Sequence, residues 1–331
     1  MIKYIVSRAA YMILVLFLVS IVAFILIQLP PGDFLTQRIL QLQASGTSVS
    51  QEQIQALTRQ YGLDLPMHRQ YLKWFGGVLR GNFGMSFQYR RPVAELIGDR
   101  LALTVAVSLF TLMFTFVVAI PVGIYSATHQ YSAGDYAVTT IGFLGLAIPN
   151  FLLALILMLG ANSIFGISVG GLFSPDYQLE PWSFGKFLDM LKHLPVPIIV
   201  IGTAGTAGLI RVMRGSLLDE LRKQYVITAR AKGLKEGEVL FKYPVRIALN
   251  PVMSTIGWAL PAIISGETIT AIVLDLPTTG PLLVQSLINQ DMYLAGSFVM
   301  ILSFLTVIGT FVSDILLVML DPRIRFERVN R

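Results

Sequence analysis

Residues that commonly carry chemistry are sparse in this chain. It contains no cysteine, which excludes disulfides, thiolate metal sites and thiol nucleophiles. Its three histidines, His68, His129 and His193, lie far apart without the spacing of metal ligands, and we interpret them as ordinary polar or interfacial residues. The sequence also lacks a Gly-x-x-x-x-Gly-Lys-Ser/Thr phosphate loop and a His-Glu-x-x-His motif. This pattern disfavours an enzyme and predicts no catalytic and no metal site.

Two acidic residues remain as candidates, because they lie in stretches that are otherwise apolar. Glu267 follows Ile264-Ser-Gly, and Asp314 lies within Val312–Ile315. A charged side chain in the centre of a bilayer costs roughly 2.5–3.5 kcal/mol on insertion scales, so each should face protein or water. Both can line a translocation pathway, and both can form an interhelical hydrogen bond. The two interpretations stay open for Glu267, and the hydrogen bond is favoured for Asp314.

The elements that position these residues are membrane-spanning helices. Of the chain, 54% is hydrophobic and only 13% is charged, whereas soluble domains carry roughly 25% charged residues. About six apolar stretches are long enough to cross a hydrocarbon core of about 30 Å. They are 9–29, 101–127, 137–161, 194–213, 252–274 and 294–320. The first is too long for the apolar region of a signal peptide, and Pro149 predicts a kink in the third. The predicted fold class is an all-α polytopic membrane protein.

Lysine and arginine predict the orientation of the spans. They gather before the first span, after the fourth and behind the sixth, which places both termini in the cytoplasm. The short loop 128–136, cytoplasmic in this arrangement, contains neither residue. The predicted segments are 1–30 with the first helix, an extracytoplasmic subdomain 31–100, a core of five helices 101–320, and a basic cytoplasmic tail 321–331. Ser50–Tyr61 within the subdomain reads as a capped amphipathic helix.

The basic segment 214–250 after the fourth span has its own helical pattern. Apolar residues recur every fourth position, at Leu217, Leu221, Tyr225 and Ala229, and predict one helix that starts near Ser216. A glycine at 233 ends this helix, and a second short helix runs from 235 to the proline at 244. Such a projection suits a groove on a soluble partner, and equally the surface of anionic lipids. The residue pattern leaves both open.

The sequence Tyr-Val-Ile-Thr-Ala-Arg-Ala-Lys-Gly-Leu at 225–234, followed by Asn250-Pro251-Val252, resembles the ATPase-coupling loop of ABC importer permeases. More narrowly, the chain resembles the B-type (first) permease of oligopeptide, dipeptide and nickel importers. Further family features are Pro31-Gly32-Asp33, Gly81–Phe87, Pro149-x-Phe151, Leu276–Leu283 and Leu320–Arg323. The chain departs from the family where Ile227-Thr228 replaces Glu-Ala, and at Ala271, where many relatives carry a glutamate.

The resemblance implies the type I ABC importer fold and a permease that forms half of the pathway for a small solute. The solute is expected to be an oligopeptide or dipeptide, with oligosaccharides as the alternative. The implied partners are a homologous second permease, two ATP-binding cassette ATPases and an extracytoplasmic solute-binding protein, in a prokaryotic plasma or inner membrane and without nucleic acid. ATP and Mg²⁺ belong to the ATPases, so no cofactor is expected in this chain. The implied coupling residues are Leu221, Tyr225, Ala229, Arg230, Ala231, Lys232, Gly233 and Leu234.

Two other classes of membrane protein would show different sequence features. A stand-alone secondary transporter or channel predicts inverted repeats and functional charges near the midplane of the membrane. The sequence contains no convincing repeat and few charges within its spans. A structural scaffold is disfavoured by the polar residues inside otherwise apolar spans.

Overall fold

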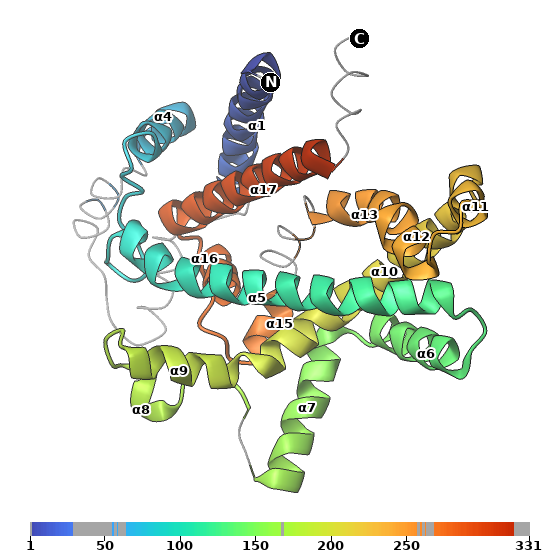
Figure 1. The fold of residues 1–331 in the computed structure, drawn as a ribbon. Coiled ribbons are helices and arrows are strands. Elements are labelled where there is room, and N and C mark those ends of the chain that lie inside the picture. Colours follow the sequence, from blue (N-terminus) through green and yellow to red (C-terminus); the bar gives the residue numbers. More distant parts are fainter. Residues whose placement is uncertain are drawn as a thin grey trace. The chain divides into compact units, whose positions relative to one another are not determined.

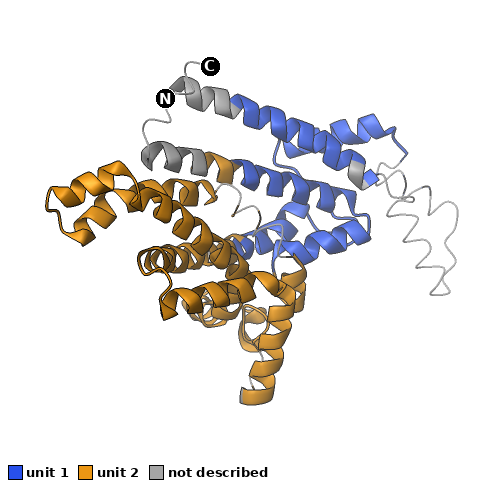
Figure 2. Ribbon diagram, turned by 90° about the vertical axis from the view of Figure 1, so that its right-hand side faces the viewer, with its two compact units in different colours: residues 1–104, 278–307 blue, residues 105–277, 308–331 orange. Residues whose placement is uncertain are grey.

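The computed structural model describes residues 2–28, 55, 58, 64–166, 169–256, 259, 262 and 268–320 (Figure 1). Within these ranges the regular structure is helical, apart from one β-bridge between Met85 and Pro92. The chain forms two compact units (Figure 2), which are residues 1–104 with 278–307 and residues 105–277 with 308–331. Most of the predicted helix 50–61, the predicted tail 321–331 and Glu267 lie outside the described residues.

Unit 1 is built on an aromatic cluster. Its helices are α1 (Ile2–Gln28), α4 (Met67–Val78), the start of α5 (Val93–Thr128), α16 (Thr279–Ile288) and most of α17 (Met292–Leu320). Phe24 of α1 packs on Tyr71 and Trp74 of α4, with ring centroids 5.4 and 5.8 Å away. The Ser20 hydroxyl lies 2.8 Å from that of Tyr71. A Cβ atom added to Gly296 of α17 would lie 3.1 Å from the Trp74 ring, so α17 approaches α4 closely at this glycine.

A buried carboxylate fixes the turn that precedes α5. Asp291 is fully buried just before α17. Its carboxylate accepts hydrogen bonds from the Ser86 hydroxyl at 2.5 Å and from the Gln88 N–H at 3.1 Å. It also accepts one from the Leu294 N–H at 3.2 Å and thereby caps the start of α17. Three donors satisfy the charge, and residues 86–88 are consequently held against the start of the last helix.

Unit 2 is organised by close packing of α5, α10 and α13. Its helices include α6 (Ala133–Ala147), α7 (Asn150–Phe165), α10 (Pro195–Leu221), α13 (Pro244–Ser254) and α15 (Thr268–Val273). Met213 and Leu217 of α10 are completely buried against Ala248 and Val252 of α13. A Cβ atom added to Gly123 of α5 would lie 2.7 Å from the Met213 Cβ, so only glycine permits this approach of α5 to α10.

Between α7 and α10 the chain forms two short helices, α8 (Pro175–Gln178) and α9 (Phe184–His193). The Ser183 hydroxyl caps α9 by accepting a hydrogen bond from the Lys186 N–H. Asp189 of α9 accepts hydrogen bonds from the N–H and the hydroxyl of Ser174, both at 2.7 Å. Burial by itself raises the pKa of Asp189, but these two bonds and the nearby His193 and Lys192 charges outweigh it and leave the pKa below its usual value.

The observed helices confirm three of the predicted spans, the second, the fourth and the sixth. Among the residues that the structure describes, three helices are long and apolar enough to cross a membrane, namely 93–128, 195–221 and 292–312, and they overlap the predicted second, fourth and sixth spans. The first predicted span lies in α1, whose apolar part is Ala10–Ile25. Pro149 does interrupt the third, and the bend of 103° between α6 and α7 makes it a broken pair rather than one kinked helix. Much of the fifth predicted span lies outside the described residues.

Candidate functional site

Two short helices joined at Gly233 project from unit 2 (Figure 1). They are α11 (Gln224–Ala231) and α12 (Glu236–Lys242), and we call residues 224–242 the α11–α12 hairpin. Gly233 has a φ of +78° and its N–H donates to the Arg230 carbonyl at 2.9 Å, so it ends α11 in the left-handed conformation. Nothing lies within 4 Å of a Cβ added there, which means that backbone conformation and not crowding favours glycine.

The hairpin has a small apolar core of its own. Val226 and Ala229 of α11 are buried against Val239 of α12. Tyr225, Leu234 and Tyr243 pack around this cluster. After Tyr243 the chain continues directly into α13, which packs on α10, and this continuity attaches the hairpin to the core of unit 2.

The prediction of one continuous helix from Ser216 is wrong. Ser216 lies inside α10, which runs on to Leu221, and α11 begins separately at Gln224. The extended backbone of Lys223 (ψ 148°) separates the two helices. The four-residue repeat persists across the break because both helices turn their apolar side chains toward the interior, which the sequence pattern alone does not distinguish from one helix. The predicted end at Gly233 and the second helix up to Pro244 are confirmed.

The predicted coupling residues divide into an inner and an outer set. Leu221 packs against the α10–α13 core, and Ala229 is buried in the hairpin. The Tyr225 hydroxyl donates to the Glu220 carboxylate at 2.5 Å, and burial together with this bond raises the pKa of Tyr225. Leu234 is half-buried. The exposed set, available to a partner, comprises Arg230, Ala231, Lys232 and Gly233.

Two exposed apolar residues of the hairpin were missed by the sequence analysis. Ile227 is 50% exposed on α11, and Phe241 is 63% exposed on α12. Neither residue belongs to the four-residue apolar repeat that faces inward. A large apolar side chain outside that repeat was the signal in the sequence that could have identified each as a contact residue. Arg230 meets Glu236 through two hydrogen bonds of 2.8 and 3.1 Å across the loop. Both side chains are exposed, so this pair orients the loop rather than adding much stability.

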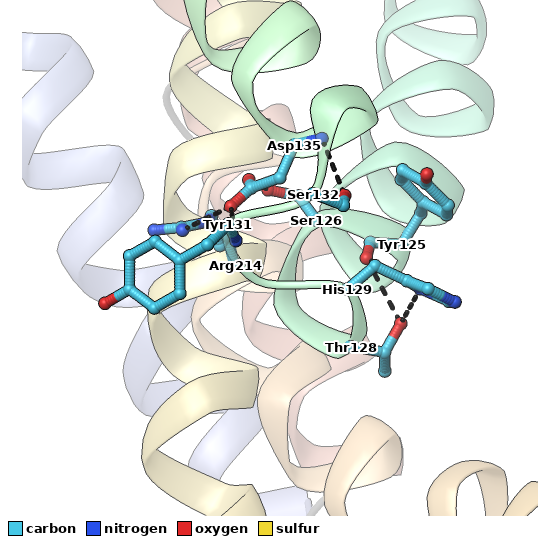
Figure 3. Close-up of polar contacts among 8 residues, drawn as sticks. All are labelled: Tyr125, Ser126, Thr128, His129, Tyr131, Ser132, Asp135 and Arg214. Carbon is cyan, nitrogen blue, oxygen red and sulfur yellow. Dashed lines mark hydrogen bonds and ion pairs between the residues drawn. The ribbon is translucent and has the colours of Figure 1, made fainter.

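A buried ion pair joins the loop 128–136 to α10 (Figure 3). Asp135, in the first turn of α6, is 3% exposed and accepts a hydrogen bond from Arg214 Nη2 at 2.9 Å. Its carboxylate also accepts hydrogen bonds from the Ser126 hydroxyl and, at 3.0 Å, from the Tyr131 N–H. Ser132 caps the same helix through the Asp135 N–H. The end of α5 and the start of α6 are therefore held against α10, about two turns before α10 ends.

In the sequence, the loop 128–136 is notable only for its lack of lysine and arginine. The pattern Ser132-x-x-Asp135 was the signal for a capped helix start. The partner Arg214 is 79 residues away and could not be assigned from the sequence. His129, beside the pair, stacks on Tyr125 at 4.7 Å and contacts the Thr128 hydroxyl at 3.0 Å (Figure 3). These are the contacts of an ordinary polar residue.

A largely apolar cavity of about 410 Å³ lies within unit 2. It is bordered by α5, by α10 and by the break between α6 and α7. Its polar lining residues are Thr111, Thr115, Asn150 and Thr255. The Thr111 hydroxyl is buried without a hydrogen-bond partner among the described residues. Neither predicted pathway residue is placed in this cavity, because Glu267 lies outside the described residues and the structure describes only the helical backbone of Asp314.

Comparisons with known proteins place this geometry in a family. Residues 119–326 match the family described as binding-protein-dependent transport system inner membrane component, and residues 1–108 match its amino-terminal companion. The chain is 35% identical to the oligopeptide transport system permease protein AppB of Bacillus subtilis, over 98% of this chain and all of the relative. It is 30% identical to the di/tripeptide permease DppB of Pseudomonas aeruginosa, over 99% and 100% of the two chains.

A solved structure shares the fold. A chain of the MetNI methionine ABC transporter in an inward-facing conformation superposes with a TM-score of 0.53, at 17% identity, over 68% of this chain and 96% of that one. This likeness supports the predicted type I importer fold. The relatives are permease subunits of transporters and not enzymes. The chain belongs to the family of binding-protein-dependent transport system inner membrane components, and it is a multi-pass membrane permease subunit of an ABC importer.

Proposed function

We propose that this permease serves an importer of oligopeptides or dipeptides and that the α11–α12 hairpin is the surface on which a separate ATPase subunit docks. The observation that carries the docking role is the hairpin itself. It is a projection with its own apolar core, a glycine-terminated tip, and exposed Ile227, Phe241 and basic residues that no described part of the chain covers. Exposed apolar anchors with a basic rim suit a groove on a protein partner.

Only some of the eight predicted coupling residues are proposed to touch the ATPase, and the others support the contact surface. The ATPase contacts exposed residues of the hairpin, namely Ile227, Arg230, Ala231, Lys232, Gly233 and Phe241. Leu221, Tyr225, Ala229 and Leu234 instead position this surface from within. The basic hairpin faces the cytoplasm in this proposal, and both termini lie on the same side.

The transport cycle follows from these attachments. ATP and Mg²⁺ bind to two partner ATPases, whose closure moves the hairpin of this chain and that of a homologous second permease. Because the hairpin is attached to α10 and α13, its movement shifts these packed helices as a body. The pathway then opens outward to accept solute from a solute-binding protein, and ATP hydrolysis returns it to the inward-facing state.

Gly233 offers a sharp test of docking, because asparagine and aspartate have the same shape. Asparagine tolerates a positive φ, and the space around Gly233 is open, so Gly233→Asn should preserve the hairpin. Gly233→Asp adds a negative charge to a surface that carries Arg230 and Lys232. We expect the aspartate variant to lose binding-protein-stimulated ATPase activity and uptake, and the asparagine variant to retain much of both.

Both variants are to be compared in purified complexes whose two permeases are present in normal amount. Equal, near-normal coupled uptake in the two variants contradicts docking through this surface. A stand-alone transporter is tested in the same preparation, since it predicts that no ATPase pair copurifies.

The peptide substrate is proposed from the relatives, which are named as oligopeptide and di/tripeptide permeases. An oligosaccharide is the alternative. Mass spectrometry of the ligand carried by the natively isolated solute-binding protein separates the two. A bound peptide supports the proposal, and a bound sugar contradicts it.

A further inference from the structure

Helix α9 has its polar and apolar faces reversed relative to a helix on a water-exposed surface. Its charged residues Lys186 and Asp189 are only 7% and 6% exposed. Its apolar residues Phe184, Phe187 and Leu188 are 76%, 40% and 43% exposed. On a water-facing helix the apolar stripe faces the core and the charges face outward. Met190 is buried as well, at 3% exposure, so the inner face of α9 holds both charged and apolar side chains, whereas the outer face exposes large apolar ones. An outer face of this kind suits contact with an apolar medium.

The inward charges are satisfied by neighbours in the same segment. Lys186 Nζ donates to the backbone carbonyls of Gln178 and Glu180, at 3.3 and 2.5 Å. The ammonium group also lies 4.9 Å from the ring centre of Phe173 and 5.8 Å from that of Trp182. Asp189 is satisfied by Ser174, as described above. These local partners offset the cost of burying the two charges, so the helix can keep Lys186 and Asp189 inside. The aromatic side chains then remain on its outer face.

The exposed apolar face continues into the residues before α9. Leu179 is 99% exposed and Trp182 is 60% exposed. With Phe184, Phe187 and Leu188 they are the exposed large apolar residues between 179 and 188, and we call this group the 179–188 patch. Exposed large apolar residues that gather within one short segment point to a contact with a membrane or a partner.

The position of α9 in the chain favours the membrane. A single residue, Leu194, separates α9 from α10, which is long and apolar enough to span the bilayer. The end of a span lies where lipid headgroups meet acyl chains. Tryptophan and phenylalanine are favoured at this depth, and an amphipathic helix there lies in the plane of the membrane. Lys192, exposed at the far end of α9, can reach headgroup phosphates.

We propose that α9 is an interfacial helix whose 179–188 patch is inserted into the lipid at the boundary of headgroups and acyl chains. Buried Lys186 and Asp189 fold the segment so that its aromatic side chains face the lipid. The anchored segment then fixes the depth at which α10 begins. This role is independent of ATPase docking at the other end of α10, so failure of either proposal leaves the other standing.

The chain contains no cysteine, so a single cysteine can be introduced and spin-labelled without first replacing native cysteines of this chain. The labelled sites are Phe187→Cys and Leu188→Cys, with Asp176→Cys on α8, also exposed but polar, as the matched control. Each is measured in the complete complex in lipid nanodiscs. The readout is the collision rate of the label with oxygen, which partitions into lipid, relative to a water-soluble nickel chelate.

The expected result is a ratio of oxygen to nickel collisions several-fold higher at 187 and 188 than at 176. A ratio equal to that of the control overturns the proposal, since the patch then faces water. Low collision rates with both reagents also overturn it, because a protein partner then covers the patch. If Phe187→Cys lowers the yield of complex, Leu179→Cys gives the same reading from a side chain that is 99% exposed.

Discussion

Replacing Arg214 by glutamine is expected to destabilise the permease by about 2–3 kcal/mol. The change leaves the carboxylate of Asp135, which is 3% exposed, without its counter-charge. Removing one partner of a fully buried ion pair costs about 3–5 kcal/mol. The expected value is lower because the Arg214 side chain is 32% exposed and because Ser126 and Tyr131 still donate to the carboxylate.

The double variant Asp135→Asn/Arg214→Gln separates charge loss from loss of packing. Both charges are then absent, so no uncompensated carboxylate remains, and we expect the loss to shrink to about 1 kcal/mol. The assay is the free energy of unfolding from equilibrium titration with a denaturing detergent in mixed micelles. Arg211→Gln is the matched control on the same helix, since exposed Arg211 lies 5.1 Å from the Phe143 ring and makes a contact of about 0.5–1 kcal/mol. Asp135→Asn is measured alone as well, and a double variant as unstable as the sum of Asp135→Asn and Arg214→Gln refutes this reasoning.

Three further predictions concern other parts of the chain. Gly123→Ala should destabilise the fold by about 1–3 kcal/mol, because its Cβ would lie 2.7 Å from that of Met213, whereas Gly208→Ala in the open cavity should be neutral or stabilising in the same titration. Asp189 has a lowered pKa in the fold, so its stabilisation is present above its unfolded pKa of about 3.9 and is lost as pH falls through the lower folded value. Acid titration of Asp189→Asn should accordingly show a shallower fall in stability than the native chain. Glu267→Gln should alter uptake or its coupling to ATPase activity if Glu267 lines the pathway, and a lower yield of assembled complex with normal uptake per complex identifies an interhelical hydrogen bond instead.

Helices with strong local signals could be predicted from the sequence. Apolar length predicted the spans in α5, α10 and α17, and the glycine at 233 predicted the end of α11. The pattern did not locate the end of α10, because Leu217 and Leu221 continue the same four-residue repeat as the next helix. Nor did it give the size of the bend at Pro149, which depends on the packing of neighbouring helices as well as on the missing N–H.

The sequence predicted where the candidate site lies in the chain, but it did not predict which of its residues are exposed. Tyr225 and Ala229 have the spacing of anchors for a partner, yet they fill the core of the hairpin, and Ile227 and Phe241 are exposed instead. Helical periodicity identifies an apolar face without saying what covers it. The Asp135 contact with Arg214 depends on tertiary packing between distant helices, which local pattern does not encode.

The unbroken course of α10 has a mechanical consequence. Its 27 residues, Pro195–Leu221, span about 40 Å at 1.5 Å per residue. If one end is held, a tilt of about 10° moves the other end by about 7 Å, on the same helical geometry. Gly205 and Gly208 face the cavity in the middle of this rod, where side chains are small and a tilt meets little steric resistance. The helix therefore acts as a lever arm, and a small displacement of the hairpin at one end is enough to tilt it along its whole length.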